Sequence, residues 1–343
     1  MQTRGKIKLL FITQKIHQND DDLAFVILWI KEFIKQGVDV QVICLEKGEF
    51  DGSFPVYSLG KEKGAGKIKR ALNFLKLIFT LKYNRVFVHM NTEYMTLGGW
   101  YWFLRGIPTY LWYTHYKMHI HLWLAGIFCK RLFAATSQSL PQYEGNPKKV
   151  VTGHGISIDF WLSAAGEGGV NTSDEHNLCS IHRICRSKRL ELGIKALKYL
   201  PQDYKLTVYG RDVEKDYYEK VREIVLKEGL ENRVIFKGPV PMAELKKIYP
   251  QFRLMINMAM ETIDKTMLEA MLFGIYPVTT PANSRAIGLP IWPKGEAPED
   301  IAEFILNGEW KKFDKGYLQK IVQEKHNLSL LVKKMLTYII KGN

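Results

Sequence analysis

The chain has 343 residues, of which 46% are hydrophobic and 24% charged, a globular composition that excludes a disordered or fibrous protein. A membrane-spanning helix needs about 18 consecutive apolar residues, and no apolar run in this sequence is that long. A length of 343 residues predicts two domains. Four cysteines are too few for a disulfide framework, so we expect a reducing cytoplasm. The formal charge of +14 is uneven, since residues 1–160 hold 21 Lys and Arg against 12 Asp and Glu; the first half can therefore face an anionic partner.

The first half alternates strand-like and helix-like segments. An apolar run at 7–13 predicts a strand, and a helix predicted over 23–36 ends at Gly37, a typical C-terminal cap. A period of two predicts a strand over 38–44, and a basic stretch with an apolar stripe predicts a helix over 67–82. Further short strands are predicted at 86–89, 109–114, 133–135 and 149–152. This order predicts a parallel sheet with helices on both faces.

A small, polar and Gly-rich segment at 163–175 predicts an interdomain linker. Strands are predicted after it at 178–184, 205–209, 234–236, 254–257 and 276–280, and helices at 189–200, 214–228, 242–249 and 264–273. We therefore predict an α/β protein with two Rossmann-like domains, residues 1–162 and 176–327, that face each other across a cleft. A C-terminal helix at 328–343 is placed so that it can pack back on the first domain. Sheets of this kind bind ligands at the carboxyl ends of their strands.

Two carboxylates, Glu261 and Glu269, flank the predicted start of the helix at 264–273. Glu261 precedes the helix and Glu269 lies two turns into it, so both can accept hydrogen bonds from ligand hydroxyls. The amides of Lys265 and Thr266 are donors at the positive end of the helix dipole, which suits a phosphate. The alternative is that the two glutamates lie on the solvent face of an amphipathic helix.

A basic loop follows the first strand of the second domain. It contains Arg183 and Lys188, five residues apart, directly before a predicted helix. Two cations at the carboxyl end of a strand suit a diphosphate, and the arginine can bind it bidentately. Taken alone, the segment is more typical of a solvated basic loop.

Together and in this order, the two segments resemble the nucleotide-sugar-binding domain of the retaining glycosyltransferases of family 4, which have the two-domain GT-B fold. The family's Gly-Arg pair and following Lys are similar to 182–183 and Lys188, and its E-x7-E motif with the continuation E-A-M is similar to 261–271. Other family segments are similar to 112–115, 152–160 and 208–210. The resemblance covers most of the chain.

The resemblance implies a role for each matched residue. Arg183 and Lys188 would neutralise the diphosphate of the donor and act in catalysis together with Glu261, which would bind the donor sugar, and His115, which would contact the sugar from the opposite domain. The implied donor-binding residues are Gly210, Val240, Thr262, Ile263, Asp264, Lys265, Thr266 and Glu269, the last on the ribose hydroxyls. Because side chains and a helix start meet the leaving charge, we expect no metal and no cofactor.

Several positions depart from the family pattern. His182 and Asp264 stand where the family has glycine, and the turn after the first strand holds three acids, Asp20, Asp21 and Asp22. We expect these acids to contact an acceptor or to cap a helix, while a metal-binding D-x-D motif is an alternative. The lost glycines leave open a sugar-nucleotide-binding protein without turnover. A Rossmann oxidoreductase is disfavoured because no G-x-G-x-x-G follows either first strand.

Residues 61–85 hold eight cations and one acid among apolar side chains, and 101–133 are rich in aromatic residues. Two readings remain open, namely helices that pack on the core with basic outer faces, and a patch that docks on an anionic membrane. We expect no nucleic-acid partner, because no such motif is present. The expected partners are thus a nucleotide sugar and a glycan or lipid-linked acceptor, in the cytoplasm or peripherally at the inner face of its membrane.

Overall fold

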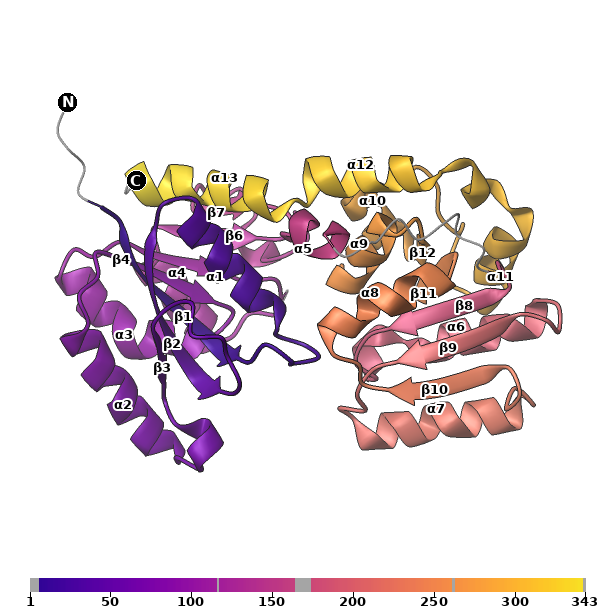
Figure 1. Cartoon of the computed structure of the whole chain (residues 1–343), viewed down its shortest axis with the longest axis horizontal. Coiled ribbons are helices and arrows are strands. Elements are labelled where there is room, and N and C mark those ends of the chain that lie inside the picture. Colours follow the sequence, from indigo (N-terminus) through magenta and orange to yellow (C-terminus); the bar gives the residue numbers. More distant parts are fainter. Residues whose placement is uncertain (1–5, 116, 164–173, 261–262, 342–343) are drawn as a thin grey trace. The chain divides into compact units, whose positions relative to one another are not determined.

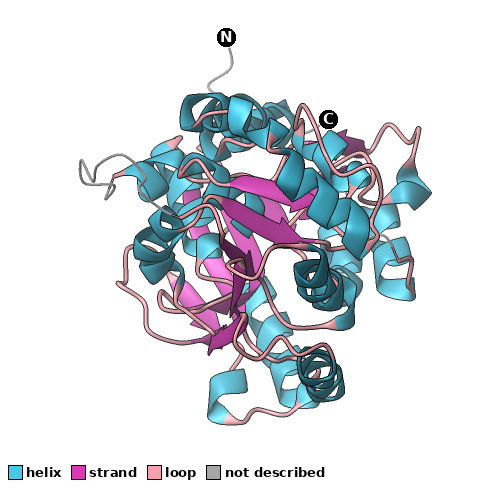
Figure 2. Cartoon of the chain, turned by 90° about the vertical axis from the view of Figure 1, so that its right-hand side faces the viewer, coloured by secondary structure: helices cyan, strands magenta, loops and turns pink. Residues whose placement is uncertain are grey.

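The computed structural model describes residues 6–115, 117–163, 174–260 and 263–341. Contacts divide the chain into two compact units, one of Met1–Gly155 with Leu328–Asn343 and one of Ile156–Asn327. Each unit has a parallel sheet, in the order β3-β2-β1-β4-β5-β6-β7 for the first and β10-β9-β8-β11-β12 for the second. Figure 2 shows these strands enclosed by helices. The predicted α/β class with two Rossmann-like units is confirmed.

The first unit is built on strands whose two faces are both buried. Its strands are β1 (Lys8–Ile16), β2 (Asp39–Lys47), β3 (Val56–Ser58), β4 (Arg85–His89), β5 (Thr109–Trp112), β6 (Arg131–Ala134) and β7 (Lys149–Val151). Successive side chains of a strand point to opposite faces. Leu9 and Phe11 of β1 accordingly lie in one core, whereas Leu10 and Ile12 lie in the other. This double burial is why β1 contains an unbroken apolar run at 9–12.

Each core of the first unit has its own helices. The helices of the unit are α1 (Phe25–Lys35), α2 (Lys67–Thr80), α3 (Thr92–Leu104), α4 (Ile120–Phe128) and α13 (Leu328–Lys341). α1 and α13 pack side by side on one face of the sheet (Figure 1). Leu331 and Met335 of α13 are buried there. α2, α3 and α4 cover the other face. Helix α3 was not among the predicted elements; its Gly98 and Gly99 lower the helix propensity.

The second unit repeats the α/β alternation. Its strands are β8 (Asn177–Ile181), β9 (Lys205–Tyr209), β10 (Val234–Gly238), β11 (Leu254–Asn257) and β12 (Tyr276–Thr279). Its helices are α5 (Ile158–Leu162), α6 (Leu190–Ala196), α7 (Lys215–Lys227), α8 (Leu245–Ile248), α9 (Lys265–Leu272), α10 (Pro281–Ile287), α11 (Pro298–Asn307) and α12 (Lys315–Lys325). One large apolar core lies between these helices and the sheet.

The boundary between the units differs from the predicted one. The sequence analysis placed α5 in a first domain of residues 1–162, but the structure places it in the second unit. The reason is Trp161, a buried side chain that packs edge-on against Tyr249 and Phe273 with ring centroids 5.7 and 6.2 Å away. Residues 164–173 of the predicted linker lie outside the described residues.

Candidate functional site

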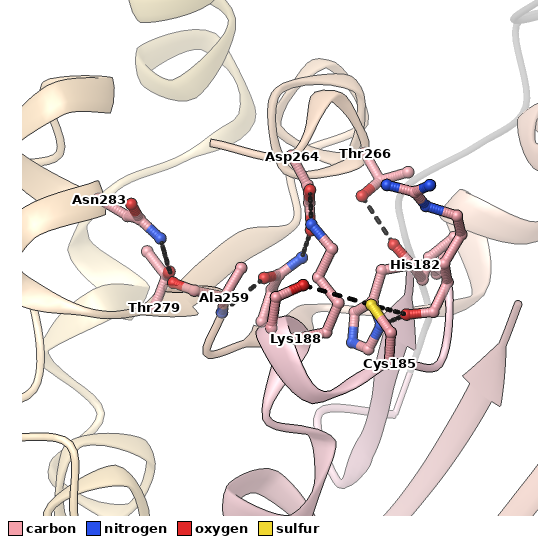
Figure 3. A network of polar contacts seen from close by, with 12 residues as sticks. His182, Cys185, Lys188, Ala259, Asp264, Thr266, Thr279 and Asn283 are labelled. Carbon is pink, nitrogen blue, oxygen red and sulfur yellow. Dashed lines mark hydrogen bonds and ion pairs between the residues drawn. The ribbon is translucent and has the colours of Figure 1, made fainter. Parts of the chain in front are cut away.

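Polar side chains gather at the carboxyl edge of the five-stranded sheet (Figure 3). All neighbouring strands of this sheet are parallel, so their carboxyl ends meet at one edge. β8 lies between β9 and β11, which brings the loop after β8 beside the loop after β11. This arrangement joins residues that are far apart in the sequence.

The central contact of this edge is an ion pair between Lys188 and Asp264. Lys188 lies in the turn after β8 and is only 7% exposed, and Asp264 directly precedes α9. The second carboxylate oxygen of Asp264 accepts a hydrogen bond of 2.8 Å from Nδ2 of Asn257, at the end of β11. Burial alone would raise the pKa of Asp264, but the charges of Lys188 and His182 hold it below the usual value. The lysine expected to meet a diphosphate therefore has a carboxylate as its partner.

The network continues along the edge toward β12. Oδ1 of Asn257 accepts from the amide of Ala259 at 3.1 Å, and the carbonyl of Ala259 accepts from Nδ2 of Asn283 at 2.8 Å. Asn283 also contacts Oγ1 of Thr279 at 3.4 Å. The sequence analysis missed these residues, although a polar residue that ends an apolar strand, such as Asn257 or Thr279, is a usable signal.

The start of α9 is held against β8 by a hydroxyl. Oγ1 of Thr266 donates to the carbonyl of Ile181 at 2.7 Å. Asp264 occupies the N-cap position of α9 but makes no capping hydrogen bond, because its carboxylate is turned toward Lys188 and Asn257. Ile263 is buried in the core and anchors this turn. Lys265 and Thr266, whose amides open the helix, are half-buried.

Glu269 lies on the second turn of α9 and is buried. One of its carboxylate oxygens accepts a hydrogen bond of 3.1 Å from the hydroxyl of Tyr249, a partner that the sequence analysis missed. Burial raises the pKa of Glu269 above its usual value, and the charge of Lys265, one turn earlier on the helix, opposes this shift. The other motif carboxylate, Glu261, and its neighbour Thr262 lie outside the described residues.

Gly210 and His182 meet where β8 and β9 end. The amide of His182 donates to the carbonyl of Tyr209 at 3.1 Å. Gly210 has φ of 149°, and a Cβ added there would lie 1.8 Å from the carbonyl oxygen of His182, so only glycine fits. Nδ1 of the buried His182 lies 3.0 Å from the carbonyl oxygen of Arg183, and burial lowers the pKa of this imidazole. The side chain of Arg183 is exposed, and Val240 packs half-buried on the core.

The remaining predicted residues belong to the first unit. His115 follows β5, is exposed, and lies edge-on to Tyr113 with ring centroids 5.3 Å apart. Asp20 is buried, pairs with Lys15 at 2.8 Å, and accepts hydrogen bonds from the amides of residues 22 and 23 ahead of α1. These hydrogen bonds close a turn ahead of α1 and do not cap the helix, whose N-cap residue is Ala24 and which has no side-chain capping hydrogen bond, so the helix-capping expectation is wrong for Asp20. Acceptor contact by Asp20, Asp21 and Asp22, like the role of His115, stays a prediction.

In the part of the chain that the structure describes, no group of three or more His, Cys, Asp or Glu side chains is arranged to hold a metal ion. Among the helices of that same part, none has both the length and the apolar character needed to cross a bilayer.

Comparison with known proteins relates the second unit to a family. Residues 169–286 match the model of the family Glycosyl transferases group 1, a segment that contains the whole network at the carboxyl edge. No curated protein matches the sequence.

Solved structures with the same fold cover nearly the whole chain. HepE of Anabaena in complex with UDP matches with a TM-score of 0.76 at 17% identity, over 98% of this chain and 100% of its own. A glycosyltransferase of Rickettsia africae matches with a TM-score of 0.76 at 13% identity, over 98% and 99%. The apo form of the lipopolysaccharide outer core galactosyltransferase WaaB matches with a TM-score of 0.70 at 15% identity, over 98% and 100%. The fold is therefore the two-domain GT-B fold.

Proposed function

We propose that this protein is a retaining glycosyltransferase that transfers a sugar from a nucleoside-diphosphate sugar to a hydroxyl of a glycan or a lipid-linked acceptor, without a metal ion. The observation that supports this most strongly is the position of Lys188 and Arg183. They follow β8 at the edge where α9 begins, inside the segment that matches a glycosyltransferase family. HepE, which has the same fold, is described in complex with UDP.

In this reaction negative charge develops on the leaving phosphate, and positively charged groups beside it stabilise that charge. The bond between the anomeric carbon and the phosphate oxygen breaks, and the acceptor oxygen forms a new bond on the same face of the sugar. The acceptor proton passes to the leaving phosphate oxygen. Arg183, Lys188 and the amides that open α9 stabilise the charge that develops there. Glu269 binds the ribose, Glu261 binds the donor sugar, and His115 contacts the reacting centre.

The first test is turnover with defined donors. The full chain is incubated with UDP- and GDP-sugars and an acceptor lysate fraction, and release of UDP or GDP is measured. Arg183→Ala should reduce transfer about 100-fold or more, and because the side chain is exposed we expect little loss of stability. Arg222→Ala removes an exposed arginine from α7 as a matched control, and it should leave turnover unchanged.

The outcomes separate the enzyme from its alternative. Equal turnover of Arg183→Ala and the wild type would refute the donor site. Binding of a nucleoside-diphosphate sugar without release of the nucleotide, with every acceptor fraction, would favour the binding protein without turnover. The stereochemistry is read from the anomeric proton coupling of the isolated product, and inversion would refute the retaining mechanism.

We also propose that the first unit docks on an anionic membrane in the cytoplasm, which would favour a lipid-linked acceptor. The support is an exposed surface on α2, α3 and α4, here called the outer helical face. Its exposed apolar side chains are Ile68, Leu72, Phe79, Trp100, Phe103, Leu104, Ile120, Trp123 and Ile127. Ile68, Phe103 and Leu104 are 80%, 65% and 75% exposed. An apolar patch of this kind is typical of an interaction surface.

The outer helical face is continuous and basic. Phe79 of α2 packs on Tyr101 of α3 with ring centroids 4.7 Å apart, and Phe103 of α3 lies 6.2 Å from Phe128 of α4. α2 carries Lys67, Lys69, Arg70 and Lys76 and no acid. Each cation near an anionic leaflet contributes about 1 kcal/mol.

Not every cation of residues 61–85 belongs to the outer helical face. Nε of Arg85 donates to the carbonyl of Ile339 at 3.0 Å, against α13, and Lys61 pairs with Glu46 at 3.0 Å. These two residues therefore serve contacts within the first unit.

Vesicle sedimentation tests the membrane proposal. The protein should pellet with vesicles that contain phosphatidylglycerol but not with neutral phosphatidylcholine vesicles, and salt should weaken the binding. Reversal of Lys67, Lys69 and Arg70 to Glu should abolish pelleting. The same reversal at the exposed Lys215, Lys220 and Lys227 of α7 is the matched control and should not. Protein that stays in the supernatant with anionic vesicles at low salt would refute docking.

A further inference from the structure

Asp264 places a negative charge where the proposed function needs positive charge. The residue directly precedes α9, and its carboxylate pairs with Lys188 instead of capping the helix. The side chain of Lys188 is only 8% exposed, so water screens its ion pair with Asp264 little. The hydrogen bond from Asn257 fixes the second oxygen of the same carboxylate.

The pairing changes the charge balance of the site. Lys188 is one of the two cations that the proposed function assigns to the diphosphate, and Asp264 neutralises it. A nucleoside-diphosphate sugar carries about two negative charges, and the free nucleoside diphosphate carries about three at neutral pH because its terminal phosphate has a second pKa near 6. The carboxylate therefore repels the product more than the donor.

We propose that Asp264 is a specificity-determining residue that competes with the bound diphosphate for Lys188 and thereby weakens binding of the nucleoside-diphosphate product. The inference rests on the proposed function. When the donor binds, Lys188 exchanges the carboxylate for a phosphate oxygen. When the sugar has left, the product carries one more negative charge than the donor, so Asp264 repels it more strongly. The ion pair between Asp264 and Lys188 re-forms when the product departs.

The inference predicts a graded effect of Asp264→Asn. The amide keeps the shape of the side chain and an acceptor for Asn257, but it removes the competing charge. UDP or GDP, whichever the protein binds, should bind about 10-fold more tightly or more. The corresponding sugar nucleotide should gain less, and the neutral nucleoside, uridine or guanosine, should gain nothing.

The test is isothermal titration calorimetry on the full chain with UDP, GDP, UDP-glucose, GDP-mannose, uridine and guanosine. Glu228→Gln is the matched control, because it removes a carboxylate paired with Lys198 at 2.6 Å, after α7 and ahead of β10 at the amino edge of the same sheet. A melting curve without ligand checks that each variant is folded. If Asp264→Asn does not fold, Asp264→Gly, the residue of the family pattern, replaces it.

Each of the three possible results either supports or overturns the inference. A gain for the diphosphate that exceeds the gain for the nucleoside, and that is absent from Glu228→Gln, supports the inference. Unchanged or weaker diphosphate binding by Asp264→Asn, with measurable binding by the wild type, overturns the inference and leaves the proposed function standing. No binding of any nucleotide by either protein overturns the proposed function and the inference with it.

Discussion

Replacement of Gly210 by alanine is a direct test of how β8 and β9 meet at the candidate site. A Cβ at this position would lie 1.8 Å from the carbonyl oxygen of His182, whereas real Cβ contacts essentially never fall under 3.0 Å. The two backbones must therefore separate by more than 1 Å. That separation removes the close contact between the backbone of Gly210 and the loop that carries Arg183.

The cost has two parts. A φ of 149° is a region that side chains rarely adopt, and it costs about 1–3 kcal/mol. Overpacking against the carbonyl adds about 1–3 kcal/mol. Gly229→Ala is the matched control in the same unit, since Gly229 also has positive φ, at 66°, but nothing lies within 4 Å of an added Cβ. It should cost about 1 kcal/mol from the backbone alone.

Calorimetry and hydrogen exchange measure the difference. For a unit of this size, about 1 kcal/mol lowers Tm by about 2–4 °C. Gly210→Ala should therefore lower the melting transition of the second unit by about 10 °C, and Gly229→Ala by about 3 °C. Hydrogen exchange measured on peptides from 174–260 assigns the melting transition to the second unit. The reasoning is refuted if Gly210→Ala melts within about 2 °C of Gly229→Ala and binds UDP or GDP like the wild type.

Three further outcomes are expected. Lys188→Met leaves the Asp264 carboxylate without its cation and should destabilise the protein by about 3 kcal/mol at pH 7. Because the paired Asp264 has a lowered pKa, the stability that the ion pair contributes is present at neutral pH and is lost in acid. Urea titrations should therefore show that the destabilisation by Lys188→Met becomes smaller below about pH 4. Burial lowers the pKa of His326 to about 4, so the unfolded chain binds the proton first and wild-type stability should fall as the pH drops from about 6.5 to 4, while His326→Gln should show a flatter profile in the same titrations. Transfer activity should survive excess EDTA, and loss with EDTA that Mn²⁺ or Mg²⁺ restores would point to a metal-dependent reaction.

Much of the fold follows from local patterns. The apolar runs of β1, β9 and β11 are buried on both faces, and strands of that kind separated by helical segments can only form parallel sheets. The strands at 205–209 and 254–257 were predicted with the bounds they have in the structure. Helix α3 was not predicted because it is apolar or aromatic nearly all round, so no stripe marks a buried face. Helix α4 lies within 101–133, where core-packing helices were one of the two interpretations left open.

The candidate site follows from the sequence only in part. Motif spacing picked out Arg183, Lys188 and Glu269 and the start of α9, because strand ends and helix starts are local features. The pairing of Lys188 with Asp264 joins residues 76 positions apart, and it depends on β8 lying beside β11 rather than beside another strand. Strand order is set by how all the helices pack on the sheet at once, so only the tertiary structure decides which charges meet.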